Sequence, residues 1–340
     1  MSLPYLTSSF AAVSARIKQE PSDFIVEEVP YYLPEGAGEH LYLFVEKEKI
    51  STHDMVSILS RELQVKEIEI GVAGLKDAQA ISRQWVSIRG LAEAAVNHIA
   101  HPGIRILKLA RHKNKLRIGH LKGNYFKIRL RDVSEDDIPR MKEVCTILEK
   151  RGVPNYFGEQ RFGLNQDTHL VGKDILEGKC KAAVSRKMKY FYMSAFQSHI
   201  FNLCLAKRLE TLDQLYLGDL AFKHENGAVF DVQNPEKELP RLLRFEISPT
   251  GPLFGTKMLE PKGPEQDLEL SVLEEEGINR ELFVSPFRGI ELNGDRRSYR
   301  FPVRELGLSY QAGSLDLTCF LPKGCYATVL LREILKNDAI

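Results

Sequence analysis

Hydrophobic and polar residues alternate along several short segments of this chain, and the alternation predicts β-strands. Residues 126–131 alternate strictly, so Phe126, Ile128 and Leu130 face one way and three cations face the other. Further strands are predicted at 23–29, 41–45, 85–88 and 315–321. Strand patterns therefore dominate the first 130 residues and return near the end of the chain.

Apolar residues spaced three and four apart predict helices. Met55, Ile58 and Leu59 share one face of a helix for which Thr52 is the expected N-cap. Further helices are predicted at 138–148, 194–209 and 327–335. Between 211 and 300 the pattern becomes irregular and is interrupted by proline and glycine. The sequence thus predicts a layered α+β domain interrupted by an insertion.

The composition is that of an ordinary globular protein. The 340 residues predict about two domains, with 43% hydrophobic and 27% charged residues. No apolar run reaches the roughly 20 residues that cross a bilayer, and residues 1–10 lack the signal-peptide pattern. The five cysteines form no Cys-x-x-Cys pair, which argues against a disulfide framework and a zinc site. We therefore expect a cytoplasmic protein without a membrane segment.

Charge is unevenly distributed along the chain. The whole protein has 47 basic and 46 acidic residues, yet residues 105–131 contain ten Lys and Arg and no Asp or Glu. A polyanion such as nucleic acid is the expected partner of this tract; the alternative is a solvated basic face that binds nothing. The cations of the alternating strand, Lys127 and Arg129 among them, are candidate phosphate contacts. Solvation of an open sheet face explains that row equally well.

One candidate for chemistry is Asp77, at the end of a loop with glycines at 71 and 74. The loop lacks the spacing of a phosphate loop, and an isolated loop Asp is more often a turn or cap residue than a catalyst. Lys18 would by default be a solvated strand lysine. His53-Asp54 has no second cluster with metal-ligand spacing, and no nucleotide-cofactor fingerprint occurs. We therefore expect neither a metal nor a cofactor.

Two aromatic segments are candidates for contacts with bases. Residues 155–163 combine aromatic residues, an Arg and two glycines, which suits either base stacking or a packed domain junction. In 123–126, Asn124 can read a base edge and Phe126 can stack on one, although Gly-Asn also marks ordinary hairpin turns.

Taken together and in order, these segments resemble the TruD family of tRNA pseudouridine synthases. The resemblance covers nearly the whole chain, and the block at 155–163 is its most specific part. The matching stretches are 18–27, 73–77, 110–113, 121–126, 153–163, 194–198 with 201–202, 248–255 and 321–328.

The resemblance implies a pseudouridine-synthase catalytic domain with a mixed, mainly antiparallel sheet flanked by helices, and an inserted α/β TRUD domain. By analogy the catalytic domain is 1–152 with 300–340, and the insertion is 153–299. The resemblance also implies roles for individual residues. Asp77 matches the catalytic aspartate and Lys18 the lysine that pairs with it, while the contacts with the target base match Asn124, Phe126 and Tyr326. Tyr326 stands where the family often has Phe.

The function implied is isomerisation of uridine to pseudouridine in tRNA, at position 13 of the D-arm, with one aspartate and no cofactor. The expected partner is tRNA, with no protein partner and a monomeric state. Two other classes compete with this interpretation. A non-catalytic RNA-binding protein would fit the basic tract, but it has no use for a charge pair in a base pocket. A carboxylate-based glycoside hydrolase would need a second acid, which cannot be identified here.

Overall fold

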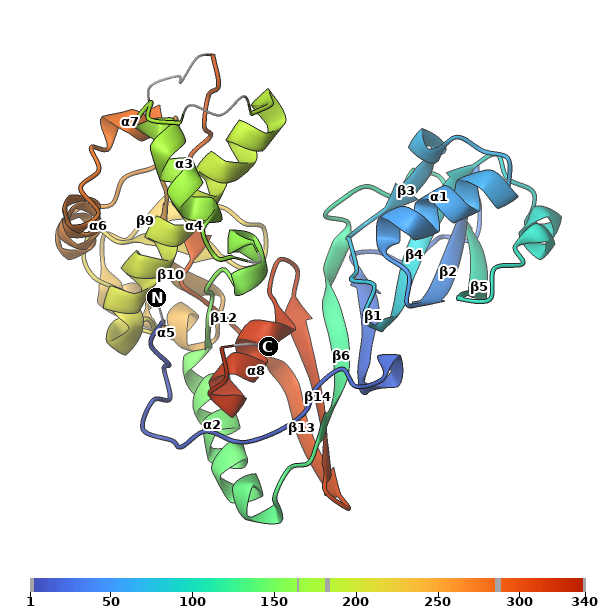
Figure 1. Ribbon diagram of the computed structural model, residues 1–340, viewed down its shortest axis with the longest axis horizontal. Coiled ribbons are helices and arrows are strands. Elements are labelled where there is room, and N and C mark those ends of the chain that lie inside the picture. The colour runs from blue at the N-terminus through green and yellow to red at the C-terminus, as the bar shows by residue number, and fades with distance from the viewer. Residues whose placement is uncertain (1–2, 164, 181–183, 285–288, 339–340) are drawn as a thin grey trace. The chain divides into compact units, whose positions relative to one another are not determined.

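The computed structural model describes residues 3–163, 165–180, 184–284 and 289–338 (Figure 1). Contacts within the chain divide it into two compact units. Unit 1 contains the described parts of Met1–Ala12, Glu143–Pro302 and Thr328–Ile340, and unit 2 contains Val13–Lys142 and Val303–Ala327. The predicted domains, 1–152 with 300–340 and 153–299, follow the family resemblance and stay a prediction.

Unit 2 is built on one eight-stranded sheet of order β13-β14-β6-β1-β4-β2-β5, with β3 paired to β4. Only β1 and β4 pair in parallel among these strands; the other pairs are antiparallel, which confirms the predicted mixed, mainly antiparallel sheet of an α+β protein. The strands are β1 (Phe24–Pro30), β2 (His40–Glu48), β3 (Ile70–Val72), β4 (Ile81–Arg89), β5 (Ile104–His112), β6 (Leu121–Arg131), β13 (Arg304–Gln311) and β14 (Ser314–Pro322).

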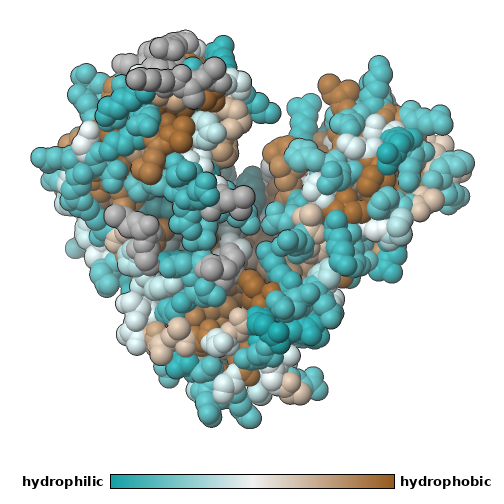
Figure 2. Space-filling view, viewed as in Figure 1, coloured by the Kyte–Doolittle hydropathy of each residue, from teal (hydrophilic) through white to brown (hydrophobic). Residues whose placement is uncertain are grey.

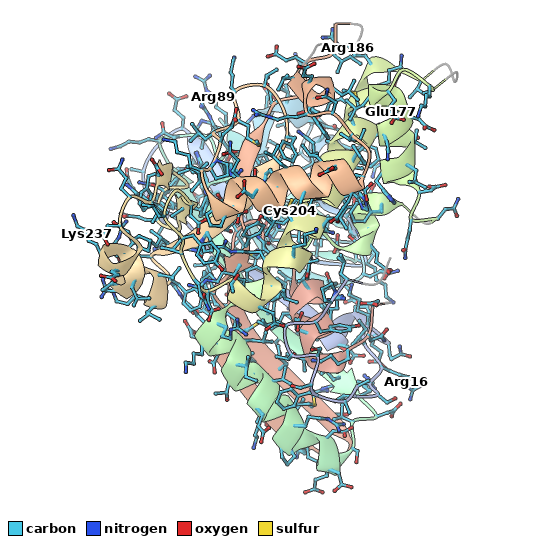
Figure 3. The ribbon with its side chains drawn as sticks, turned by 90° about the vertical axis from the view of Figure 1, so that its left-hand side faces the viewer. Arg16, Arg89, Glu177, Arg186, Cys204 and Lys237 are labelled. Carbon is cyan, nitrogen blue, oxygen red and sulfur yellow. The ribbon has the colours of Figure 1, made fainter. Side chains whose placement is uncertain are left out.

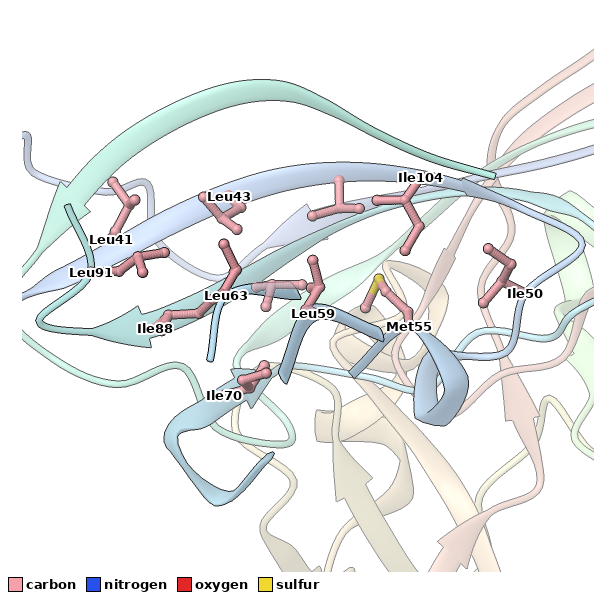
Figure 4. Packing of buried hydrophobic residues seen from close by; sticks show 12 residues of the cluster. Leu41, Leu43, Ile50, Met55, Leu59, Leu63, Ile70, Ile88, Leu91 and Ile104 are labelled. Atoms are coloured by element: carbon pink, nitrogen blue, oxygen red, sulfur yellow. The ribbon is translucent and has the colours of Figure 1, made fainter. Parts of the chain in front are cut away.

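Helix α1 (Thr52–Glu62) covers one face of this sheet. Its N-cap is Ser51, whose hydroxyl accepts a hydrogen bond from the Asp54 N–H, so the expected cap at Thr52 is wrong by one residue. The one-residue shift leaves the Thr52 hydroxyl free to bond elsewhere. Figure 4 shows Met55 and Leu59 packed against the inward-facing aliphatic residues of the strands. These buried residues form the core of unit 2: Leu41, Leu43, Val45, Ile50, Leu63, Ile70, Val86, Ile88, Leu91 and Ile104.

The opposite face of the same strands carries a smaller cluster. Tyr42, Phe44 and Trp85 pack there with tilted rings, and Leu116 and Leu121 complete the cluster. Successive strand residues point to opposite faces, so the two clusters lie on the two sides of one layer.

Unit 1 surrounds the long helix α4 (Arg186–Arg208), which packs against α3, α6 and β10. In Figure 3, Cys204 lies toward the inside of this unit, whereas Arg186 and Lys237 project outward; Cys204 is fully buried. The sheet order is β11-β10-β8-β9, and β12 pairs with β7. The remaining elements are α2 (Ile138–Arg151), β7 (Val153–Pro154), α3 (Thr168–Leu176), β8 (Leu220–Lys223), β9 (Val229–Asp231), α5 (Pro235–Leu243), β10 (Ile247–Leu253), α6 (Pro264–Glu275), α7 (Glu281–Val284), β11 (Asp295–Ser298), β12 (Arg300–Phe301) and α8 (Ala327–Leu335).

Short 3-10 turns connect several of these elements. They are η1 (Pro21–Asp23), η2 (Glu67–Glu69), η3 (Glu93–His98), η4 (Glu135–Asp137), η5 (Glu159–Phe162) and η6 (Leu209–Thr211).

The irregular pattern between 211 and 300 left the positions of the helices and strands there unpredicted. Helix α6 lies there, and its inward face carries Glu265 and Glu269, both buried. Arg208 pairs with Glu265 at 3.1 Å, and Arg296 pairs with Glu269 at 2.6 Å. Buried acids need partners, and both of these acids have one. The helix therefore buries charged residues at positions where apolar residues are expected, so apolar periodicity does not reveal it in the sequence.

The start of the aromatic block, residues 155–157, is packed within unit 1. Tyr156 is buried, and the Asn155 amide donates to the Ser298 carbonyl at 2.9 Å. Phe157 contacts the edge of Phe201, with 5.5 Å between ring centroids. For these three residues the structure favours the packed alternative over base stacking.

Figure 2 shows mostly hydrophilic residues on one face of the molecule. Among the described residues, no helix combines the length and apolar composition needed to cross a membrane.

The packing of the core beneath α1 predicts how substitutions on this helix change stability. Leu59→Ala removes a fully buried side chain and should lower the free energy of unfolding by about 2–5 kcal/mol. Urea unfolding followed by circular dichroism measures the change. The exposed His53→Ala on the same helix is the control, expected within about 0.5 kcal/mol of wild type. Equal losses in the two variants would contradict the packing.

Candidate active site

The loop that carries Asp77 runs from the end of β3 to the start of β4. A close backbone approach requires Gly71 of β3, whereas Gly74 of the loop lies against a side chain. A Cβ at Gly71 would lie 2.3 Å from the Leu116 carbonyl oxygen, and one at Gly74 would lie 3.2 Å from the Lys76 Nζ. Backbone therefore packs at this loop where a larger residue would push its neighbours away.

Buried polar groups hold the loop from beneath. The Lys76 backbone N–H donates to the Thr52 hydroxyl at 2.8 Å, and that hydroxyl donates to Gln84 Oε1 at 3.1 Å. The Gln84 amide in turn donates to the Gly74 carbonyl at 3.3 Å. This chain of bonds ties α1, β4 and the loop together, just before Asp77.

The Lys76 side chain turns inward and pairs with Glu28 of β1 at 3.3 Å. Both side chains are almost completely buried. Burial raises the pKa of the Glu28 carboxyl, and the Lys76 ammonium opposes the rise. Because Lys76 is committed to Glu28, the exposed Asp77 is the loop's outward-facing charge.

A second buried lysine, Lys47 of β2, lies below Asp77. Its Nζ donates to the carbonyls of Ile50, Lys76 and Asp77, the last at 2.9 Å. Burial lowers the pKa of Lys47 to about 8, and the Asp77 carboxylate acts in the opposite direction. The structure thus places an ammonium beside Asp77 that the sequence reasoning missed. The sequence does contain a clue, because Lys47 continues the alternation of Leu41, Leu43 and Val45 on the inward face of β2.

Lys18, the predicted partner of Asp77, lies with the aromatic residues. Its Nζ is 4.8 Å from the centre of the Phe24 ring, and Phe24 meets Phe126 edge to face at 6.0 Å. Among the described residues no hydrogen bond or ion pair joins Lys18 to Asp77. The structure therefore places Lys18 against Phe24, which contacts Phe126, and its pairing with Asp77 stays a prediction.

Asn124 and Phe126 lie two residues apart on β6 and share one face of the sheet. Asn124 pairs with Leu321 of β14, and the turn that follows β14 leads to Tyr326, whose side chain is exposed. The Lys323 N–H donates to the Lys122 carbonyl at 3.1 Å, which holds that turn against the start of β6. Asn124 Oδ1 is buried and has no partner in the described part of the chain.

Lys127 and Arg129 occupy the other face of β6. Arg129 donates two hydrogen bonds to Asp316 of β14, at 2.7 and 3.0 Å, and Lys127 lies 3.7 Å from the same carboxylate. Hydrogen bonding from Arg129, aided by its charge and that of Lys127, lowers the pKa of Asp316. The structure thus separates this pair from Phe126 by the thickness of the sheet.

The acid-free tract 105–131 is largely paired in the folded chain. Neighbouring segments supply the acids, so the charge imbalance along the sequence is much reduced in space. The pairs are Arg105–Glu46, Arg111–Glu93, Lys113–Glu35, Lys127–Asp316, Arg129–Asp316 and Arg131–Asp23.

The buried Lys47 leads to a prediction on pH. Its pKa is about 8 in the folded chain against an ordinary value of 10.5, so between these values the unfolded chain binds more protons. The contribution of Lys47 to the free energy of unfolding should therefore rise from pH 8 to pH 10.5. Lys47→Met lacks this rise, and the stability of wild type relative to the variant should increase over that range.

Urea unfolding at pH 7, 9 and 10 measures the difference. Lys49→Met, which removes an exposed ammonium two residues away, controls for the loss of one charge. A difference between wild type and Lys47→Met that stays flat or falls with pH would contradict the buried position.

Known proteins resemble this chain over nearly its whole length. The family model described as tRNA pseudouridine synthase D (TruD) matches residues 1–186 and 182–334. The chain is 44% identical to tRNA pseudouridine synthase D of Thermus thermophilus, over 99% of this chain and 93% of that protein. It is 39% identical to the protein of that name from Geobacter metallireducens, over 98% of both.

A solved structure gives the same result. The crystal structure of the putative tRNA pseudouridine synthase D from Methanosarcina mazei matches with a TM-score of 0.85 and 25% identity. The match covers 99% of each chain.

Proposed function

Because the chain belongs to the TruD family, we propose that it isomerises uridine to pseudouridine at position 13 of the tRNA D-arm, with Asp77 as its one catalytic carboxylate. Membership of this family means that the protein is a tRNA pseudouridine synthase, an isomerase that acts on uridine in tRNA. The position in the D-arm and the roles of individual residues are what we propose beyond family membership.

The observation that carries the role of Asp77 is its exposed carboxylate on a loop held by buried groups. Thr52 and Gln84 fix the backbone before it, and the Lys47 ammonium lies beneath it. The buried groups therefore hold the backbone from which the exposed Asp77 side chain projects, and both general-base and nucleophilic chemistry require such a fixed attachment.

The reaction makes one carboxylate sufficient. Isomerisation breaks the bond between N1 of uracil and C1′ of the ribose, turns the base and joins C5 to the same carbon. The departing uracil spreads its negative charge over its carbonyl groups, so it needs less protonation than the alkoxide leaving group of a glycosidase. A second acid, which paired-carboxylate glycosidases use, is therefore unnecessary. All the atoms come from the substrate, and no cofactor is needed.

The remaining residues of the proposed site hold the base. Phe126 would stack on the everted uracil, a contact worth about 1–3 kcal/mol for a typical base and aromatic ring. Asn124 has an unpartnered buried oxygen that can accept a hydrogen bond from the uracil N3–H. Lys18 lies beside Phe24, which contacts Phe126. We propose that the Lys18 ammonium lies beside the base-binding face, near Phe126. Tyr326, in the turn after β14, would also contact the base.

Asp77→Asn should abolish the chemistry and spare binding. Formation of pseudouridine releases the hydrogen on C5, so tritium release from a tRNA transcript labelled at that carbon measures turnover. The variant should lose more than about 10³-fold in rate, because the amide cannot serve as base or nucleophile, while its Kd for tRNA stays near wild type.

Asp54→Asn on α1 is the matched control, since it removes one exposed negative charge and should retain turnover. A rate for Asp77→Asn within tenfold of wild type would remove Asp77 from the mechanism. The same assay on a transcript with cytidine at position 13 tests the site, and continued release would overturn the D-arm assignment.

Lys127 and Arg129 are proposed contacts for the RNA backbone, although they lie on the opposite face of β6 from Phe126. They face away from Phe126 and share Asp316, so the group of three contributes only about one net positive charge. Replacing both by Ala should reduce the slope of log Kd against log salt by about 1, because fewer counterions are released. Arg61→Ala with Lys66→Ala, near α1, is the control, and an identical slope in the two double variants would exclude the row from the interface.

A further inference from the structure

Unit 2 contains a second site that the proposed chemistry does not use. It is an open pocket of about 510 Å³ beside the end of β5, between the segment after β1 and residues 113–120. This volume is within the usual range for a pocket that holds a small ligand. Its principal lining residues are Tyr32, His112, Asn114, Lys115, Arg117 and His120.

Aromatic side chains form one wall of the pocket. Tyr32 stacks on His112, with 4.8 Å between ring centres and 26° between ring planes. Its hydroxyl hydrogen-bonds to His120 Nδ1 at 2.9 Å, and the Tyr42 hydroxyl donates to the Asn114 carbonyl at 2.9 Å. These bonds fix the rings in place, while Tyr32 remains only half buried. A planar base can stack on such a preformed surface.

The charge of the pocket is positive. Its one acid, Glu35, lies 3.4 Å from the Lys113 ammonium, so that pair is neutral. Lys115 donates to the Ile68 carbonyl, which leaves its charge without an acid. Arg117 is exposed, and it forms no ion pair within the described ranges. Two cations thus remain for a ligand, and an arginine without a carboxylate is suited to bind a phosphate in a bidentate manner.

The pocket is built directly against the loop of Asp77. The Gly119 N–H donates to the Ala73 carbonyl at 2.8 Å, four residues before Asp77. Lys323, in the turn that leads to Tyr326, donates to the Gly119 carbonyl at 3.3 Å. The segment that presents Arg117 therefore contacts both of the chain segments that flank the proposed catalytic cavity.

We propose that this pocket binds one nucleotide of the substrate RNA outside the catalytic cavity, with its base on Tyr32 and its phosphate on Arg117 and Lys115. This rests on the proposed function, because the RNA must reach the Asp77 loop. The site would add affinity and position the strand without taking part in bond breaking.

The experiment compares Arg117→Ala with Arg61→Ala, which removes an equally exposed arginine from α1. Kd for a full-length tRNA transcript is measured between 50 and 200 mM salt, together with kcat and KM from tritium release. Arg117→Ala should raise Kd and KM about tenfold and reduce the salt slope by about 1, with kcat at saturating tRNA within twofold of wild type. Arg61→Ala should match wild type.

Tyr32→Leu provides a second arm, since it keeps apolar bulk and removes the stacking ring. It should raise Kd about tenfold with little change in salt slope, because stacking releases no counterions. Trp85 is the chain's single tryptophan and lies next to Tyr42, so its unchanged emission checks that this wall is intact. If the wall is disturbed, Arg117→Ala alone decides.

The proposal is overturned if Arg117→Ala and Arg61→Ala have the same Kd and salt slope. It is also overturned if Arg117→Ala lowers kcat and leaves Kd unchanged, since that assigns the arginine to the chemistry. Failure of the proposed function is distinguishable: wild type would bind tRNA and release no tritium, and the Kd comparison would still test the pocket.

Discussion

The constraint on which this structure depends is a gap in the pairing of β4. The strand pairs with β1 through residues 81–83 and with β3 through residues 86–88. Between them the Glu28 carboxylate accepts the Trp85 N–H at 3.3 Å, and the Gln84 side chain binds the Gly74 carbonyl. Side chains thus provide the hydrogen bonds that a neighbouring strand would otherwise make. The loop that carries Asp77 crosses at this gap.

The side chains around the gap in the pairing of β4 include buried charged groups, and these groups make one position of the Asp77 loop specific. Glu28 and Lys76 compensate one another, while Lys47 is held by three carbonyl oxygens. Removing one member of such a set leaves an uncompensated group out of water, which typically costs 3–5 kcal/mol. An alternative position of the loop would carry that cost. The backbone of the loop that carries the exposed Asp77 is therefore held by buried residues of the neighbouring strands and helix.

Some of this organisation could be predicted from sequence because it follows from local periodicity. The alternation at 126–131 and 315–321 marked β6 and β14, and the apolar spacing at 327–335 marked α8. Strand β5 was missed because its register shifts opposite Phe44 and Val45, so Ile106 and Lys108 point to opposite faces. A single extra residue reverses the alternation from which a strand is predicted. Lys47 was missed for a different reason, since only the fold shows that its ammonium meets the Asp77 loop.

The basic tract shows how charge along a sequence differs from charge in space. Residues 105–131 contain no acid, yet Glu46, Glu93, Glu35, Asp316 and Asp23 approach them from other strands and loops. Antiparallel pairing makes this general, because a strand's cations face residues distant in sequence. The electrostatic footprint for an anionic partner is then set by the cations that lack an acid after folding. Arg117 and Lys115 are such cations, and both line the pocket beside the Asp77 loop. Within the described residues the tract keeps four cations that form no ion pair, and two of them, Lys115 and Arg117, line this pocket; the other two are Lys108 and Lys122.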